Sequence, residues 1–337
     1  MKAVGYTHSL PISEPLALKD LVIADPRLER PHDLLVKVAA VAVNPVDAKV
    51  RRNRRPAPGA PGILGWDAIG TVLATNDEAQ GFQIGDRVFY AGAIDRPGCN
   101  SELHVVDSRI VGHAPVSLTN AHAAALPLTS LTAWELLFDR LGVPYGGGEG
   151  QSLLVIGGAG GVGSILIQIA SQLTQLQVIA TASRPESVRW ASDLGAHGVI
   201  DHTRPFLPQL RALGLGEISM AASLTHSPQH LDDIVATLAP QGRLAMIDEF
   251  ESLDIMKLKS KSISLHWELM FTRSLYGTAD ISRQGQILRE IAQLADSGRI
   301  RTTLAENFGA INAANLKRAH ALIESGRTIG KLVLEGF

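Results

Sequence analysis

A run of glycines between two apolar stretches is the feature that most restricts how this sequence can fold. The segment SLLVIGGAGGVGSILIQIA, residues 152–170, carries no charge, and five of the seven residues from Gly157 to Gly163 are glycine. The uncharged run extends from Gln151 to Ser183, longer than the roughly 20 apolar residues that a membrane span needs. Because the glycines interrupt it, the segment favours a strand, a turn and a separate helix over one continuous span.

Both sides of the glycine turn have the hydrophobic pattern of regular structure. Leu153 to Ile156 form an apolar run typical of a buried strand. After the turn, apolar residues recur three and four positions apart, as on one face of a helix: Val162, Ile165, Leu166, Ile169 and Leu173. The order of strand, glycine turn and helix is the start of a βαβ unit.

The glycines themselves predict a dinucleotide site. Gly158, Gly160 and Gly163 match the pattern G-x-G-x-x-G. In this pattern the first glycine allows the tight turn, the second lets backbone amides approach a pyrophosphate, and the third lets helix and strand pack closely. We therefore expect Gly158, Gly160, Gly161, Val162 and Gly163 to hold a pyrophosphate at the helix N-terminus.

The end of the second strand indicates which dinucleotide is preferred. NAD enzymes usually place an Asp or Glu there, about 20 residues beyond the glycines, to bind the ribose hydroxyls. This sequence has Ser183 and Arg184 instead, and its first carboxylate is Glu186. Because a hydroxyl and a guanidinium suit a 2′-phosphate, we predict NADPH as the cofactor.

The chain divides into a mostly β part and an alternating part. Its 337 residues suggest about two domains. Up to about residue 125 short strands are separated by turns, for example at residues 33–44, 65–75 and 81–90. From residue 152 strands and helices alternate, which predicts a parallel sheet with helices on both faces. Near the end we expect helices at 280–297 and 313–325 and a closing strand, GKLVLE.

Composition excludes several other classes. The formal net charge of −2 gives no reason to expect nucleic acid or an anionic membrane as a partner. The only cysteine, Cys99, permits no internal disulfide and no thiolate-rich zinc site. The first residues lack the apolar run of a signal peptide, so we expect a cytoplasmic protein. Arg51, Arg52, Arg54 and Arg55 form a basic cluster, interpreted as a solvated loop, with phosphate binding as the alternative.

Longer motifs resemble a known family. The segments VAVNPVDAKVR, GDRVF, AAALPLTSLTAWELL, LLVIGGAGGVGSILIQIA and GKLVL resemble the landmarks of the medium-chain dehydrogenase/reductase superfamily, on its quinone oxidoreductase side. The segments LAPQGRLAMID, HWELMFTRS and AHALIESGRTIGKLVL resemble its zinc-type alcohol dehydrogenase-like subgroup. The resemblance implies an α/β protein. A GroES-like, mostly β catalytic domain would span 1–125, completed by 266–337, and a doubly wound Rossmann sheet would span 126–265.

The resemblance also locates the positions where zinc-dependent relatives bind metal. Asn44, Trp66 and Leu128 stand at these positions, and none of them is a zinc ligand. Asp67 could bind a cation, but one carboxylate does not make a site. His226 and His230 have helical spacing, yet Pro228 lies between them and no third ligand is evident. We therefore expect no zinc.

The remaining site residues follow from the family's positions. Asn44 would donate a hydrogen bond to the substrate, Asp47 would orient its loop, and Trp66 and Tyr90 would line the cleft, with Tyr90 also a candidate proton donor. Thr132 and Lys331 lie in segments that face the cofactor in relatives. Since hydrogen bonds stabilise an oxyanion less than a metal does, activated acceptors such as quinones and α,β-unsaturated carbonyls are the predicted substrates.

Three further expectations complete the sequence interpretation. The resemblance implies a homodimer joined through the Rossmann domains. Two other functions stay open: a zinc-type alcohol dehydrogenase, and a protein that binds NADPH or nucleic acid without catalytic turnover.

Overall fold

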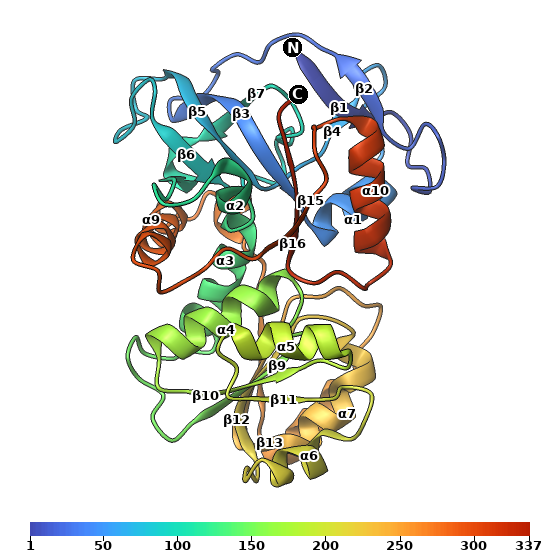
Figure 1. The fold of residues 1–337 in the computed structure, drawn as a ribbon, viewed down its shortest axis with the longest axis vertical. Coiled ribbons are helices and arrows are strands. Elements are labelled where there is room, and N and C mark those ends of the chain that lie inside the picture. The colour runs from blue at the N-terminus through green and yellow to red at the C-terminus, as the bar shows by residue number, and fades with distance from the viewer. The chain divides into compact units, whose positions relative to one another are not determined.

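The computed structural model describes all 337 residues, which form two compact units. The first combines Met1–Leu131 with Phe271–Phe337, and the second is Thr132–Met270. Figure 1 shows the blue N-terminal and red C-terminal parts of the chain together in the first unit. The units divide after Leu131 and Met270, whereas the sequence predicted boundaries after residues 125 and 265. The last strand of the inserted sheet runs to Trp267, past the predicted second boundary.

The second unit is built on a six-stranded parallel sheet. Its strands are β9 (Ser152–Ile156), β10 (Gln177–Thr181), β11 (Gly198–Ile200), β12 (Ile218–Ser223), β13 (Leu238–Met246) and β14 (Ser264–Trp267). They lie in the order β11-β10-β9-β12-β13-β14. This is the 3-2-1-4-5-6 order of a doubly wound dinucleotide-binding fold, so that prediction is confirmed.

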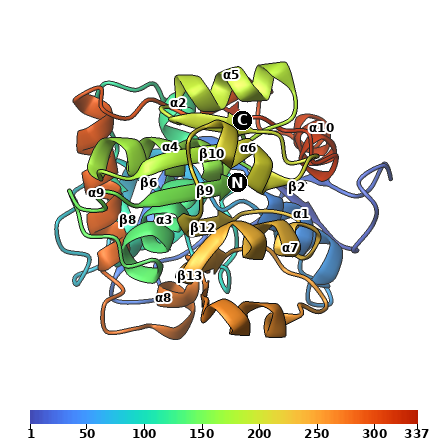
Figure 2. The same cartoon turned by 90° about the horizontal axis from the view of Figure 1, so that it is seen from below.

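Helices cover both faces of this sheet, as Figure 2 shows for α4 and α5 against α7. The helical elements of this unit are η2 (Glu135–Arg140), α4 (Gly161–Leu173), α5 (Pro185–Asp193), α6 (Phe206–Ala212), α7 (Ser227–Thr237) and η3 (Ile255–Lys261). Phe206 and Leu210 of α6 and Ile234 of α7 pack with strand residues such as Leu154 in one buried core. Burying this apolar surface holds the helices against the sheet.

The first unit is mostly β, as predicted. A seven-stranded sheet has the order β15-β16-β3-β5-β6-β8, with β7 also paired to β3, and a small sheet has the order β2-β1-β4. The strands are β1 (Lys2–Tyr6), β2 (Lys19–Val22), β3 (Asp33–Val43), β4 (Gly62–Ile63), β5 (Ala68–Thr75), β6 (Arg87–Tyr90), β7 (Leu103–Asp107), β8 (Val111–His113), β15 (Leu304–Asn307) and β16 (Lys331–Glu335). The closing strand β16 pairs with β3, so the end of the chain completes the N-terminal sheet.

The helices of the first unit pack against these sheets, for example α2 against β3 and β5, and α9 against β8. They are α1 (Pro45–Asn53), η1 (Ser108–Ile110), α2 (Asn120–Ala124), α8 (Thr272–Tyr276), α9 (Arg283–Asp296) and α10 (Ala313–Glu324), while α3 (Pro127–Trp134) contains the division between the units. The predicted helices at 280–297 and 313–325 are confirmed as α9 and α10. None of the helices combines the length and apolar character that a membrane crossing requires.

Part of the basic cluster corrects the sequence interpretation. Arg51 and Arg52 lie on helix α1 and not in a loop, whereas Arg54 and Arg55 follow the helix as exposed residues, in agreement with a solvated loop. The Arg51 side chain is buried, pairs with Glu324 of α10 and donates to the Leu10 carbonyl. An unpaired buried guanidinium would be costly, so Arg51 joins α1 to α10 and does not face solvent or a phosphate.

Candidate functional site

The glycine turn of the second unit connects β9 to α4. The strand ends at Ile156, and α4 begins at Gly161 with Gly160 as its N-cap. Gly157 has a φ of +83°, a left-handed conformation that side chains other than glycine rarely adopt. The tight turn is therefore made by Gly157, whereas the sequence pattern assigned it to Gly158.

Close packing explains the other glycines. A Cβ at Gly163 would lie 2.4 Å from the carbonyl oxygen of Gly157, and one at Gly158 would lie 2.7 Å from the Cβ of Ala180 on β10. A Cβ at Gly160 would meet nothing closer than 3.4 Å. Gly163 and Gly158 are thus required by the fold itself, while Gly160 leaves space beside the N-terminus of α4. Gly161 and Val162 form the first turn of that helix.

The end of β10 adjoins this turn. The Thr181 hydroxyl accepts a hydrogen bond from the Gly157 N–H at 3.0 Å, and the Thr181 carbonyl accepts from the Gly158 N–H at 3.2 Å. Ser183, two residues further on, is exposed. Arg184 is the N-cap of α5, half-buried, with its Nε 3.5 Å from a Glu186 carboxylate oxygen. A positive helix N-terminus, an exposed hydroxyl and a guanidinium therefore lie at one edge of the sheet, a set of groups that fits a phosphorylated dinucleotide.

A second polar cluster is buried in the first unit, where β3, β5 and β16 meet. Asn44 follows β3, Asp67 precedes β5, and Lys331 begins β16. The Lys331 ammonium lies 2.9 Å from Asp67 Oδ2 and 3.1 Å from the Val43 carbonyl, and it donates to Asn44 Oδ1. All three N–H groups of the ammonium thus have acceptors. Lys331, assigned to the cofactor from family position, holds the Asn44 amide and the Asp67 carboxylate.

Asp67 is the acceptor at the centre of this polar cluster. In addition to the hydrogen bond from the Lys331 ammonium, its carboxylate accepts hydrogen bonds from Asn44 Nδ2 at 2.8 Å and from the Leu128 N–H at 2.7 Å. Burial raises the pKa of Asp67, and the Lys331 charge opposes that rise. The cation that Asp67 binds in this structure is therefore the ammonium of Lys331.

Asp47 connects this cluster to helix α1. It is the third residue of the helix and accepts the Asn44 N–H at 2.7 Å, while Pro45 occupies the first position. Burial raises the pKa of Asp47 to about 7. Its carboxylate thus holds the backbone N–H of Asn44.

Trp66 and Tyr90 are both buried. The Trp66 indole donates to the Ala93 carbonyl at 3.1 Å and meets the Phe271 ring edge to face. Tyr90 Oη lies 3.0 Å from His104 Nδ1, and His104 Nε2 lies 3.0 Å from the Pro97 carbonyl. Burial lowers the pKa of His104 to about 4, so its ring is neutral at pH 7 and Nδ1 accepts the Tyr90 hydrogen. The hydroxyl of Tyr90 is thus committed to His104.

Two carboxyl groups of the second unit were missed by sequence reasoning. Glu268, directly after β14, and Glu135, at the start of the π-helical segment η2, are both buried and interact electrostatically. Arg140 Nε donates to Glu268 at 2.8 Å. Burial, with the Glu135 carboxyl as a further cause, raises the pKa of Glu268 to about 8. Thr132, the other predicted cofactor residue, is buried on α3.

A zinc ion does not fit the residues at the family's ligand positions. Asn44 bonds to Lys331 and Asp67, Trp66 bonds to Ala93, and Leu128 contributes only its backbone N–H. Cys99 is buried with its thiol 3.5 Å from the Asp67 carbonyl, and burial raises the pKa of this thiol. No group of three or more His, Cys, Asp or Glu side chains is arranged to hold a metal ion.

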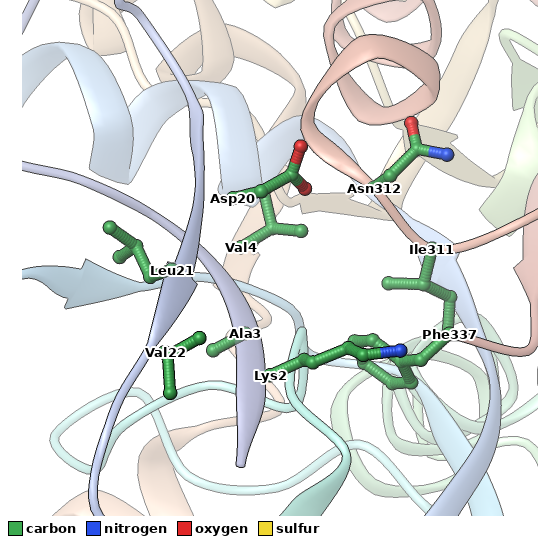
Figure 3. Close-up of a pocket in the computed structure, with 9 residues that line it drawn as sticks. All are labelled: Lys2, Ala3, Val4, Asp20, Leu21, Val22, Ile311, Asn312 and Phe337. Carbon is green, nitrogen blue, oxygen red and sulfur yellow. The ribbon is translucent and has the colours of Figure 1, made fainter.

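A pocket of the first unit lies away from these residues. Figure 3 shows it between the β1–β2 hairpin and the residues that precede α10. Its volume is about 410 Å³, with Asp20 and Asn312 at one end and Lys2 and Phe337 at the other. None of the predicted site residues lines it, so it adds nothing to the candidate site.

Comparisons with known proteins match both parts of the chain. Residues 30–119 match the alcohol dehydrogenase GroES-like domain, and residues 194–334 match the zinc-binding dehydrogenase family. A zinc-type alcohol dehydrogenase-like protein of Staphylococcus epidermidis is 36% identical over 337 residues, 99% of each chain. A quinone oxidoreductase of Pseudomonas aeruginosa is 32% identical over 95% of each chain.

Solved structures share the whole fold. A protein of Rhizobium etli CFN 42 classed as a zinc-dependent alcohol dehydrogenase is 52% identical, with a TM-score of 0.96 over 100% of this chain and 98% of that one. A mycobacterial protein complexed with NADPH is 26% identical, with a TM-score of 0.84 over 99% of each chain.

Proposed function

The chain belongs to the medium-chain dehydrogenase/reductase superfamily and is an oxidoreductase of that type, and we propose that it reduces quinones or α,β-unsaturated carbonyl compounds with NADPH and without zinc. The observation that carries the proposal is the glycine turn before α4, at the carboxyl edge of a sheet in dinucleotide-binding order. Similarity to the quinone oxidoreductase of Pseudomonas aeruginosa supports the substrate class.

The second unit would hold the cofactor. The N-terminus of α4 and the space beside Gly160 suit the pyrophosphate, and Ser183 and Arg184 suit the 2′-phosphate. The NADPH complex of the mycobacterial relative supports this cofactor. Bound NADPH supplies a hydride, so one proton must also reach the reduced substrate, and solvent can supply it.

Asn44 would polarise the substrate carbonyl. Its Oδ1 accepts from the Lys331 ammonium, which draws electron density from the amide and strengthens its N–H donors. One Nδ2 hydrogen is held by Asp67 at 2.8 Å, but the other has only a long contact of 3.4 Å to the Ala42 carbonyl. A substrate oxygen can replace that contact. Since charge in a quinone or enone spreads through conjugation onto oxygen, one polarised donor is sufficient for such acceptors.

The test is an NADPH oxidation screen across quinones, enones, aldehydes and ketones, with zinc content measured on the same sample. We expect turnover of quinones or enones that a chelator leaves intact, and poor oxidation of simple alcohols. Asn44→Ala should lower kcat more than NADPH affinity, while Asn53→Ala, an exposed position on the same helix, should change neither. Loss of activity on chelation, restored by zinc, would overturn the metal-free mechanism. NADPH binding without turnover on any acceptor would leave only a binding function.

Cofactor preference has its own test. A charge-assisted hydrogen bond contributes about 1.5–3 kcal/mol, so Arg184→Ala should weaken NADPH binding roughly 10-fold to 100-fold and leave NADH nearly unchanged. Arg189→Ala, an exposed arginine on the same helix α5, is the matched control. Equal losses for both cofactors would contradict a phosphate-binding role for Arg184.

We also propose a homodimer formed through the second unit. Strand β14 is the last strand of the parallel sheet, and Trp267 and Leu269 beside it are 53% and 50% exposed. An open strand edge with exposed apolar side chains is a pairing surface. A monomer mass by light scattering at micromolar concentration would contradict this proposal.

A further inference from the structure

Three histidines gather at the carboxyl edge of the parallel sheet and have no role in the site described above. His202 follows β11, His226 is the N-cap of α7, and His230 lies in the first turn of that helix. The His202 and His230 rings meet edge to face with their centroids 6.0 Å apart, and His230 also packs on Phe206. Sequence reasoning examined His226 and His230 only as metal ligands and did not consider His202.

Strand register places these histidines beside the cofactor residues. Thr181 of β10 is paired with Ile200 of β11, and the Ala182 N–H donates to the Ile200 carbonyl at 2.9 Å. Arg184 and His202 therefore follow the ends of two adjacent strands, β10 and β11, at the same level of the sheet. The guanidinium of Arg184 acts electrostatically on His202.

The end of strand β12 also lies next to the glycine turn. Ser223, the last residue of β12, is paired with Ile156, the last residue of β9. A Cβ at Gly157 would lie 3.0 Å from the Thr225 methyl group, so the residue before His226 packs against the turn. The Thr225 hydroxyl lies 2.6 Å from His226 Nδ1. The glycine turn, Arg184 and the histidines thus belong to one edge of one unit.

We propose that His202 and His226, together with Arg184, form the site for the 2′-phosphate of the cofactor, and that protonation of His202 makes the preference for a 2′-phosphorylated ligand depend on pH. This inference rests on the proposed function, because it assumes that the edge binds a dinucleotide. It adds two specificity-determining residues that the glycine pattern does not contain.

The charges around the histidines support this role. Burial, the His226 ring and Arg184 lower the pKa of His202, while Asp201 opposes them. Burial, His202 and His226 lower the pKa of His230, against Asp233 and Asp248.

All three acids have hydrogen-bond donors nearby. Asp201 accepts from the N–H and hydroxyl of Thr203, Asp233 from the Phe206 N–H, and Asp248 from Ser227. With positive neighbours and few free acids, His202 is neutral at pH 7 in the absence of ligand. A phosphate dianion favours its protonated form, so binding takes up a proton.

The backbone at His226 is consistent with a functional constraint. Its φ of +52° is left-handed, which is uncommon for a residue other than glycine and tends to occur where the surrounding structure requires it. This conformation turns the chain out of β12 and into α7. It also makes asparagine the suitable replacement, because asparagine tolerates the left-handed region.

Calorimetry with two small probes tests the proposal on the full chain. Adenosine 2′,5′-bisphosphate carries the 2′-phosphate, and adenosine 5′-phosphate lacks it. The second pKa of a phosphate monoester is about 6, so measurements between pH 6.5 and 8.5 keep the ligand largely dianionic. A single coupled proton changes affinity by at most about tenfold per pH unit. We expect the affinity of the bisphosphate to fall about fivefold to 20-fold over this range, and that of the monophosphate to stay nearly constant.

Variants assign the effect to particular residues. The pair His202→Gln with His226→Asn should reduce the pH dependence for the bisphosphate to about twofold, whereas His266→Gln, a histidine on β14 in the same unit, should leave it unchanged. Titrations of the unmodified protein in two buffers of different ionisation enthalpy should show proton uptake with the bisphosphate only. This measurement does not depend on the folding of any variant.

Two results would overturn the inference in different ways. Equal pH dependence in the double variant and the unmodified protein, or no proton uptake, would exclude the histidines and leave the proposed cofactor intact. Failure of both probes and of NADPH to bind would refute the proposed function as well.

Discussion

Removing the Lys331 ammonium should destabilise the first unit strongly. The ammonium lies 2.9 Å from Asp67, and the side chains of the pair are 3% and 0% exposed. Breaking a buried ion pair by deleting one partner costs about 3–5 kcal/mol, because the other charge is left without compensation. For a unit of roughly 200 residues, each kcal/mol shifts Tm by about 2–4 °C. Lys331→Met, which preserves most of the side-chain length, should therefore lower Tm by roughly 6–20 °C.

The pH dependence of this loss has a definite sign. Without the ammonium, the pKa of Asp67 rises further above its value in an unfolded chain, because the Lys331 charge no longer opposes the effect of burial. A carboxyl group whose folded-state pKa is raised stabilises the fold at low pH, and that stability is lost as pH rises through the raised value. The deficit of Lys331→Met relative to the unmodified protein should accordingly be smaller at pH 5 than at pH 8.

Urea and thermal unfolding, followed by circular dichroism at both pH values, measure the effect. Lys317→Met, an exposed lysine on α10, is the control and should change stability by less than about 0.5 kcal/mol. Adding Asp67→Asn to Lys331→Met should recover most of the loss, since it removes the uncompensated charge. A cost below about 1 kcal/mol, or a double variant as unstable as the sum of the two single variants, would show that Lys331 and Asp67 are not coupled in this way.

The glycine turn, the buried Glu268 and the exposed Trp267 can each be tested by substitution. Gly163→Ala should lower Tm, because its methyl group would lie 2.4 Å from the Gly157 carbonyl oxygen. Gly160→Ala should leave Tm unchanged and weaken NADPH binding. The opposite pattern in melting and titration experiments would contradict the roles given to these two glycines. Because the pKa of Glu268 is raised to about 8, stability should fall as pH rises from about 4.5 to 8, and Glu268→Gln should flatten that slope in urea unfolding. Trp267→Glu should convert the proposed dimer to monomers by light scattering, and an unchanged dimer mass would place the interface elsewhere.

Local sequence patterns predicted the parts of the fold that depend on near neighbours. The apolar run before Gly157 and the three- and four-residue spacing after it specify β9 and α4, because burial of one face imposes that period. The exact position of the turn was not predictable from the glycine pattern. All five glycines in these seven residues permit a positive φ, and only the folded structure shows that Gly157 is the one that adopts it.

Ion pairs between buried side chains could not be predicted from local sequence patterns. Lys331 and Asp67 are 264 residues apart, and Arg51 and Glu324 are 273 apart. The sequence around Arg51 is indistinguishable from an exposed basic segment until the buried contact with α10 is known. Asn44 was placed by family position, but its commitment to Lys331 depends on the pairing of β16 with β3. Such contacts are set by tertiary structure, which local propensity does not encode.

The return of β16 to the N-terminal sheet has a consequence for synthesis on the ribosome. A chain emerges from the ribosome with its N-terminal side first, and domains generally fold as units as they emerge. Residues 132–270 are contiguous and can fold before β16 is synthesised, whereas the first unit waits for that strand. Until Lys331 leaves the exit tunnel, Asp67 has no counter-charge and β3 has an open edge. The nascent first unit therefore stays incomplete until β16 emerges, which completes both the sheet and the ion pair.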